Sequence, residues 1–165
     1  MRGLRRLRRG GGPCVSGGAL TLEDRVRVAL YERFVEDGEA PDPAAVATAL
    51  GIPRKDAEAA YGRLAEGRVL VLSPGTTQVW MAPPFSAVPT AFRVRTPRGA
   101  YWGNCIWDGL GIVSILGGEG TVETRCADCD EPMTLRVGAG ELLDGDGVAH
   151  FAVPAAGWWD DIGFT

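Results

Sequence analysis

Apolar residues near the start of the chain recur at helical spacing. They stand four positions apart, at Leu22, Val26, Leu30 and Phe34. A T-x-x-D capping box precedes them, so the pattern predicts a helix over residues 21–35. An aspartate cap followed by proline predicts a second helix over residues 42–51. A face of small and apolar residues predicts a third helix over residues 53–66.

Two β-rich runs follow in "RVLVLSPGTTQVWMA", on either side of a Ser-Pro-Gly turn that is typical of a hairpin. Three helices and a hairpin are typical of a winged-helix module, which we expect, with a linker, over residues 19–90. Such a module binds DNA when its third helix enters the major groove. This stretch carries seven basic and ten acidic side chains, and the charges of its third helix cancel. A DNA-binding face needs positive charge, so the composition favours a structural or interaction role.

The pattern changes after "APPFSAVPTAF", whose three prolines indicate a linker or a connection that lies along the surface. Residues 91–165 predict a small α+β domain with a mainly antiparallel sheet and one prominent helix over residues 100–116. Strands are expected over residues 91–95 and in four short runs, "TVETRC", "MTLRV", "GVAHFAVP" and "WWDDIGFT". The whole chain is therefore expected to be α+β, a winged-helix module followed by this domain.

Charge and cysteine content bear on the setting of the protein. The 165-residue chain has a net charge of −4, but residues 1–18 carry five arginines and no acidic side chain. Those residues lack the apolar core of a secretory signal, so we expect a disordered basic tail or a start codon assigned too far upstream. No apolar run is long enough for a membrane helix. Four cysteines in a chain of this length are typical of a reducing compartment, which indicates the cytoplasm.

The stretch "YWGNCIWDGLG" places Cys105 three residues before Asp108. On a helix this spacing puts both side chains on one face. A thiol beside a carboxyl group can capture a soft metal or attack as a nucleophile while the acid delivers a proton. A buried cysteine acting as a small apolar residue is the other interpretation, and spacing alone favours it.

Cys126 and Cys129 form a single CxxC pair between two predicted strands. They could be half of a zinc site, but two ligands do not complete a tetrahedron, and only Cys105, His150 and carboxylates could add to them. A thioredoxin-type redox role is disfavoured because that motif opens a helix. His150, the only histidine, has no hydrolase signature around it, and no phosphate-binding glycine motif is present.

Taken together, the ordered segments "YWGNCIWDGLGI", "TVETRCADCDEPMTLRV" and "WWDDIGFT" resemble the alkylmercury lyase family over roughly residues 19–165. The resemblance implies a winged-helix module joined to a catalytic domain. It also implies that Cys105 binds mercury, that Asp108 shuttles the proton, and that Trp102 and Trp107 line a dry pocket. The expected substrate is an organomercurial, and the products are a hydrocarbon and Hg(II).

The same resemblance implies no resident cofactor. It implies low-molecular-weight thiols as partners and mercuric reductase as a candidate acceptor of Hg(II), with no nucleic acid or membrane. One departure stands out, because the family has a second cysteine near the end of the W-x-D-I-x-F-T segment and this sequence ends at Thr165. The cysteine is lost, the gene is truncated, or Cys126, Cys129 or Cys14 substitutes. A winged-helix regulator or metal-sensing protein without lyase activity, and a silent domain whose CxxC pair holds zinc, are the alternatives.

Overall fold

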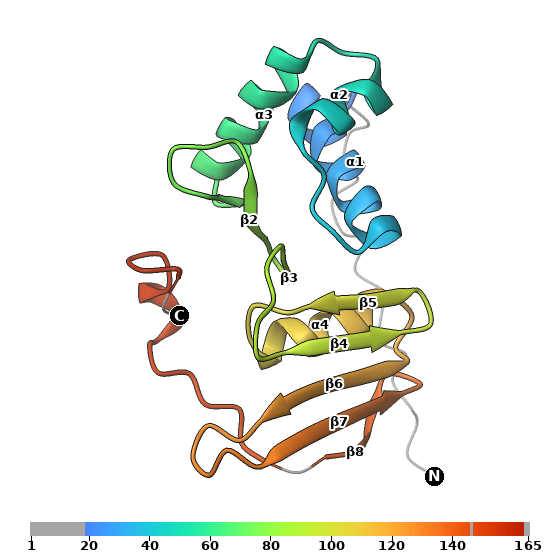
Figure 1. Ribbon diagram of the computed structural model, residues 1–165, viewed down its shortest axis with the longest axis vertical. Coiled ribbons are helices and arrows are strands. Elements are labelled where there is room, and N and C mark those ends of the chain that lie inside the picture. Colours follow the sequence, from blue (N-terminus) through green and yellow to red (C-terminus); the bar gives the residue numbers. More distant parts are fainter. Residues whose placement is uncertain (1–18, 146, 164–165) are drawn as a thin grey trace, which may run out of the picture.

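Three helices open the part of the chain that a computed structural model describes, residues 19–145 and 147–163 (Figure 1). They are α1 (Leu22–Asp37), α2 (Pro43–Leu50) and α3 (Arg54–Glu66). The capping box at the start of α1 is present, with the Thr21 hydroxyl accepting from the Asp24 amide at 3.1 Å. The three helices predicted from the pattern are confirmed. The expected tail, residues 1–18, lies outside the described residues.

A three-stranded antiparallel sheet of order β1-β2-β3 follows the helices. Its strands are β1 (Val71–Leu72), β2 (Val79–Ala82) and β3 (Phe85–Ser86). The predicted hairpin is confirmed as the β1–β2 pair. The linker expected around "APPFSAVPTAF" is wrong for Phe85 and Ser86, which pair with β2 and are almost fully buried. The large apolar ring of Phe85 accounts for the difference, because its burial outweighs the turn signal of the prolines around it.

The second half of the chain forms a five-stranded antiparallel sheet of order β5-β4-β6-β7-β8. The strands are β4 (Arg93–Thr96), β5 (Gly99–Trp102), β6 (Gly120–Arg125), β7 (Pro132–Gly138) and β8 (Glu141–Asp144). Helix α4 (Ile106–Ile115) packs against β4 and β6 (Figure 1). Helices combined with antiparallel sheets confirm the α+β class. They do not by themselves establish the winged-helix assignment.

The helix predicted over residues 100–116 begins six residues late, at Ile106. Residues 100–102 belong to β5, in which the Tyr101 side chain is buried while its neighbours are only partly covered. That alternation is the period of a strand, and an apolar spacing that continued into α4 concealed it. The β6–β7 pair is confirmed as predicted.

The strands expected from "GVAHFAVP" and "WWDDIGFT" are wrong for the described residues. Apart from a short 3₁₀ turn at Ala155–Gly157, this part of the chain is irregular. It pairs with no neighbouring strand, and Pro154 has no amide hydrogen to donate to one. Strand β8 was not predicted, because adjacent Leu142 and Leu143 give no alternation and both are exposed.

The buried apolar residues form a single cluster that joins the helices to the larger sheet. The Phe85 ring lies between those of Phe34 and Tyr101, with centroid distances of 5.0 and 5.4 Å. The Tyr101 hydroxyl donates a 2.7 Å hydrogen bond to the Val35 carbonyl. These contacts fix the helical half against the sheet, while the proposed domain boundary at residue 90 stays a prediction. None of the helices in the described ranges is long and apolar enough to span a bilayer.

Candidate active site

Cys105 is the N-cap residue of α4, and Asp108 lies in the first turn of that helix. The Cys105 backbone is extended, and its Sγ accepts a 3.4 Å hydrogen bond from the backbone amide of Asp108. The spacing of the two residues therefore reflects a capping arrangement rather than two positions on one helical face. The structure brings the predicted thiol and carboxyl group together at a helix N-terminus, where the exposed amides favour negative charge.

Two glycines allow this helix end to lie close to the sheet. A Cβ added to Gly103 would lie 2.8 Å from the Gly109 amide nitrogen. One added to Gly109 would lie 2.9 Å from a methyl group of Val122 in β6. Both distances are shorter than real side chains allow, so the glycines around Cys105 are needed to seat α4. The position of the thiol thus depends on the packing of α4 on β6.

Asn104 is a third polar residue of the site, and no sequence motif predicted it. Its side-chain amide donates to Oδ2 of Asp108 at 3.1 Å and to the Pro84 carbonyl at 3.3 Å. Both partners are acceptors, so the Asn104 amide group must point its nitrogen toward them. The Oδ1 atom of Asn104 is then buried without a hydrogen-bond partner. Asn104 therefore holds the Asp108 carboxyl group against the cis Pro83–Pro84 segment. Only its place next to Cys105 could have pointed to it.

Burial dominates the electrostatics of the thiol and the carboxyl group. It raises the pKa of Asp108, and the hydrogen bond from Asn104 opposes this effect. Burial also raises the pKa of Cys105, against the hydrogen bond from the Asp108 amide, and the negative charge of Asp108 raises it further. Cys105 therefore keeps its proton until something displaces it. Asp108 holds a proton at higher pH than an ordinary aspartate does.

A cavity of about 210 Å³ lies beside the pair and is built from four segments of the chain. Its lining residues are Arg68, Met81, Pro83, Asn104, Cys105, Trp107, Asp108, Phe151, Trp158, Trp159 and Ile162. The last four belong to the C-terminal segment, which leaves β8 and turns back toward the helical half (Figure 1). The Arg68 guanidinium stacks over the Trp159 ring at 5.4 Å from its centroid. Most of the wall is apolar, which suits an organic ligand.

The aromatic residues expected at this cavity are only partly those found. Trp107 lines it and has 66% of its surface exposed, which places it at the rim. Trp158 and Trp159 also line it. The expectation for Trp102 is wrong. Trp102 belongs to β5 rather than to α4, so it lines a second cavity instead. There the Arg93 guanidinium carbon lies 4.3 Å from the centroid of the Trp102 ring.

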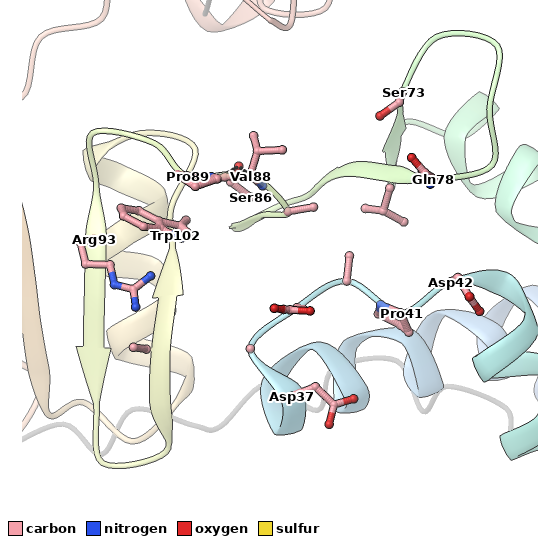
Figure 2. Close-up of a pocket in the computed structure, with 16 residues that line it drawn as sticks. Asp37, Pro41, Asp42, Ser73, Gln78, Ser86, Val88, Pro89, Arg93 and Trp102 are labelled. Carbon is pink, nitrogen blue, oxygen red and sulfur yellow. Dashed lines mark hydrogen bonds between the residues drawn. The ribbon is translucent and has the colours of Figure 1, made fainter.

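That other cavity is larger, about 610 Å³, and lies between the helical half and the β4–β5 hairpin. In Figure 2, Arg93 and Trp102 stand on one side, and Asp37 and Asp42 stand on the other. Its lining includes acidic side chains and one guanidinium group but no cysteine. It therefore offers no ligand for a soft metal, and the chemistry described above is confined to the smaller cavity.

The remaining sequence candidates lie elsewhere. Cys126, which is partly buried, and Cys129, which is exposed, belong to the turn between β6 and β7 and do not line the cavity. Within residues 19–145 and 147–163, no group of three or more His, Cys, Asp or Glu side chains could hold a metal ion. His150 is exposed on the irregular C-terminal segment. Cys14 lies outside the described residues, and among those described only Cys105 brings a thiol to the cavity.

Comparison with known proteins agrees with this geometry. The family model described as alkylmercury lyase matches residues 85–165. A crystal structure of the mercury-bound form of MerB2 superimposes with a TM-score of 0.60 and 21% sequence identity. The superposition covers 77% of this chain and 61% of that one, so this chain spans less than two thirds of the solved chain. No curated protein matches the sequence.

The solved structure supports the fold, and the family model supports the assignment of the sequence. The matched segment contains α4 with Cys105 and Asp108, the five-stranded sheet and the described C-terminal residues that line the cavity. The resemblance noted from the sequence is thus confirmed over residues 85–165, which match the family model described as alkylmercury lyase and make up just under half of this chain.

Proposed function

We propose that this protein cleaves the carbon–mercury bond of organomercurials by protonolysis. The observation that carries the proposal is the pairing of the Cys105 thiol with the Asp108 carboxyl group at the N-terminus of α4, beside an apolar cavity. Mercury is a soft metal and prefers thiolate ligands, which makes Cys105 its expected ligand. The match of residues 85–165 to the alkylmercury lyase family model supports the same reaction.

The two raised pKa values suit a proton that moves within the pair. The proposed reaction starts from a protonated Cys105 thiol, which burial favours, and an ionised Asp108, whose charge the hydrogen bond from Asn104 stabilises. Binding of R–Hg–X forms the bond between Cys105 Sγ and mercury, releases X⁻ and transfers the thiol proton to Asp108. Asp108 then protonates the carbon as the carbon–mercury bond breaks, which releases R–H. Mercury(II) is left on the Cys105 sulfur and Asp108 is again ionised, so the proton that began on the thiol ends in the hydrocarbon.

We propose that the apolar walls of the cavity bind the organic group of the substrate. Trp159, Trp158 and Phe151 offer flat apolar surfaces to the organic group R. Excluding water from the Cys105–Asp108 pair also strengthens the interaction of the developing carbanion with the proton of the acid. Low-molecular-weight thiols from solution would complete the coordination of Hg(II). Mercuric reductase is a candidate acceptor of that product, and we place the reaction in the cytoplasm.

We further propose that residues 19–90 form a winged-helix module whose role is structural. Two arginines of α3 are already engaged in ion pairs, Arg54 with Glu58 and Arg63 with Glu23 of α1. These contacts leave little free positive charge for phosphate. The alternative, a winged-helix regulator or metal sensor, requires binding to DNA at low salt. Fluorescence anisotropy with labelled promoter DNA tests it, and binding that weakens steeply with salt would favour the regulator.

Gas chromatography of the headspace above a phenylmercury incubation tests the lyase proposal. The purified protein with excess thiol should release benzene faster than the Cys105→Ser variant does. The Cys129→Ser variant is a matched control, because Cys129 is exposed and lies outside the cavity. It should release the first equivalent of benzene at the wild-type rate. Release that is no faster from the wild type than from Cys105→Ser would remove the enzymatic claim.

A further inference from the structure

The turn between β6 and β7 holds two thiols in one short loop. Within it, the Asp130 amide donates to the Cys126 carbonyl at 2.9 Å, and the Cys126 amide donates to the Glu131 carbonyl at 2.9 Å. The first of these bonds closes one helical turn, so Cys126 and Cys129 stand at positions i and i+3 and face the same side. Both cysteines are free rather than joined in a disulfide.

A bidentate ion pair fixes the shape of this turn. The Arg125 guanidinium contacts both carboxylate oxygens of Asp130, at 2.6 and 3.0 Å. The pair is exposed and adds little stability, but its fork geometry limits the conformations of the residues between its ends. The two sulfur atoms are therefore held near one another instead of being brought together from a flexible loop.

The turn lies at the same end of the sheet as Cys105. Arg93 of β4 pairs with Trp102 on one side and with Glu123 on the other. Cys105 comes three residues after Trp102, and Cys126 comes three residues after Glu123. The segments that follow β5 and β6 leave the sheet at the same end, because both strands are antiparallel to β4. The site of bond cleavage and the exposed thiols thus open on one end of the domain.

The electronic state of Cys126 favours metal binding. Hydrogen bonds from the backbone amides of Cys129 and Asp128, and from the Cys129 thiol, lower the pKa of the Cys126 thiol. A thiolate is the form that binds a soft metal. Mercury(II) on Cys105 thus has a pair of free thiols at the same end of the domain.

We propose that Cys126 and Cys129 form an exposed dithiol site that takes Hg(II) from Cys105. This inference rests on the proposed function for the origin of the metal, but the binding site itself does not. Mercury(II) is stable with two thiolates, so the pair needs no third protein ligand, unlike a zinc site. Among the described residues that line the cavity, only Cys105 carries a thiol. The surface turn provides the further thiols that two-coordinate mercury needs.

The transfer is a ligand exchange without a change of oxidation state. It starts from mercury bound to Cys105 and to a small-molecule thiolate, RS⁻. The Cys126 thiolate and the Cys129 thiol form two new sulfur–mercury bonds, while the bonds to Cys105 and RS⁻ break. The proton of Cys129 passes to Cys105, and RS⁻ leaves. Because both new ligands belong to one chain, the exchange gains from a high effective concentration over free monothiols.

Inorganic Hg(II) tests the site without any carbon–mercury cleavage. The Cys14→Ser variant, which removes the thiol outside the described residues, serves as the parent. The protein is loaded with mercuric chloride, passed through a gel-filtration column in excess glutathione, and assayed for mercury by mass spectrometry. The parent and its Cys105→Ser derivative should each retain one equivalent. Derivatives with Cys126→Ser or Cys129→Ser should bind about a hundredfold more weakly and lose it.

The outcomes separate this proposal from the lyase proposal. Retention of mercury that survives Cys129→Ser, or that is lost with Cys105→Ser alone, would overturn the dithiol site. Mercury retained by the pair in a protein that releases no benzene would sink the lyase proposal and leave the site standing. In the lyase assay, Cys129→Ser should slow the turnovers that follow the first one. Because Cys129 is exposed, its serine variant should melt at the temperature of the parent.

Discussion

The side-chain amide of Asn104 donates a 3.1 Å hydrogen bond to Oδ2 of Asp108. This bond lowers the pKa of a carboxyl group whose pKa burial raises. Replacing Asn104 by alanine should therefore move the acidic limb of the pH–rate profile to higher pH. A hydrogen bond to a charged group is worth about 1.5–3 kcal/mol, so at a pH on the acidic limb the rate should fall about tenfold or more. Gln78→Ala, in the other cavity, is the control.

The pH–rate profile of the wild-type protein should be bell-shaped. The productive state needs Asp108 ionised and Cys105 protonated, so the rate should fall below the pKa of the acid and above that of the thiol. Both pKa values are raised, which shifts both limbs to higher pH than those of unperturbed side chains. Steady-state rates of benzene release across pH test this. An acidic limb at the pH of an ordinary aspartate would contradict it.

Replacing Asp108 by asparagine should separate activity from stability. Loss of the general acid should slow benzene release about 10²- to 10⁴-fold. Because the folded pKa of Asp108 is raised, the stabilising contribution of the protonated form is lost as pH rises through that value. The variant should therefore melt at or above the wild-type temperature at neutral pH. The advantage should vanish below about pH 4, where the unfolded carboxyl group is also protonated. A lower melting temperature at neutral pH would contradict this assignment.

Two stacked tryptophans allow a matched test of substrate recognition. Trp159 stacks on Arg68 at the cavity beside Cys105, and Trp102 stacks on Arg93 at the other cavity. Trp159→Ala should raise KM for phenylmercury about three- to tenfold and affect methylmercury less, because an aryl group gains more from aromatic contact. Trp102→Ala should leave the ratio of the two KM values unchanged. Equal effects of the two variants would contradict the assigned binding wall.

The shared core predicts one cooperative unfolding transition. Phe85 is fully buried between Phe34 and Tyr101, so Phe85→Ala should cost about 3–5 kcal/mol in the free energy of unfolding. Phe151→Ala, at a residue 38% exposed, should cost about 1 kcal/mol or less. Urea titration followed by far-ultraviolet circular dichroism and by tryptophan fluorescence measures both. Two separate transitions would show that the halves do not share a core.

Elements with strong local signals were predictable from the sequence. The capping box before α1 and the Asp-Pro start of α2 fix helix ends through interactions between neighbouring residues. The paired strands β6 and β7 likewise carry their alternation in the sequence. The thiol and carboxyl group of Cys105 and Asp108 were also found, although their local geometry is a helix cap rather than a shared face.

Features that depend on distant contacts were not predictable. Phe85 is buried because rings from α1 and β5 meet it, which no pattern around "APPFSAVPTAF" reveals. The C-terminal segment carries strand-like alternation, yet its aromatic residues line a cavity beside α4. Asn104 matters because the chain brings Pro84 and Asp108 to its side-chain amide. In each case the contact that gives the residue its role forms only when the chain folds.

Deuterium incorporation during a single turnover tests the central claim most directly. With phenylmercury as substrate in D₂O, the Cys105 thiol exchanges its proton for deuterium before the substrate binds. The wild-type protein should then release monodeuterated benzene, at a rate that Cys105→Ser and Asp108→Asn each reduce toward that of buffer with thiol alone. Mass spectrometry of the released benzene gives both the label and the rate. A wild-type rate equal to that of buffer with thiol would contradict protonolysis by the Cys105–Asp108 pair.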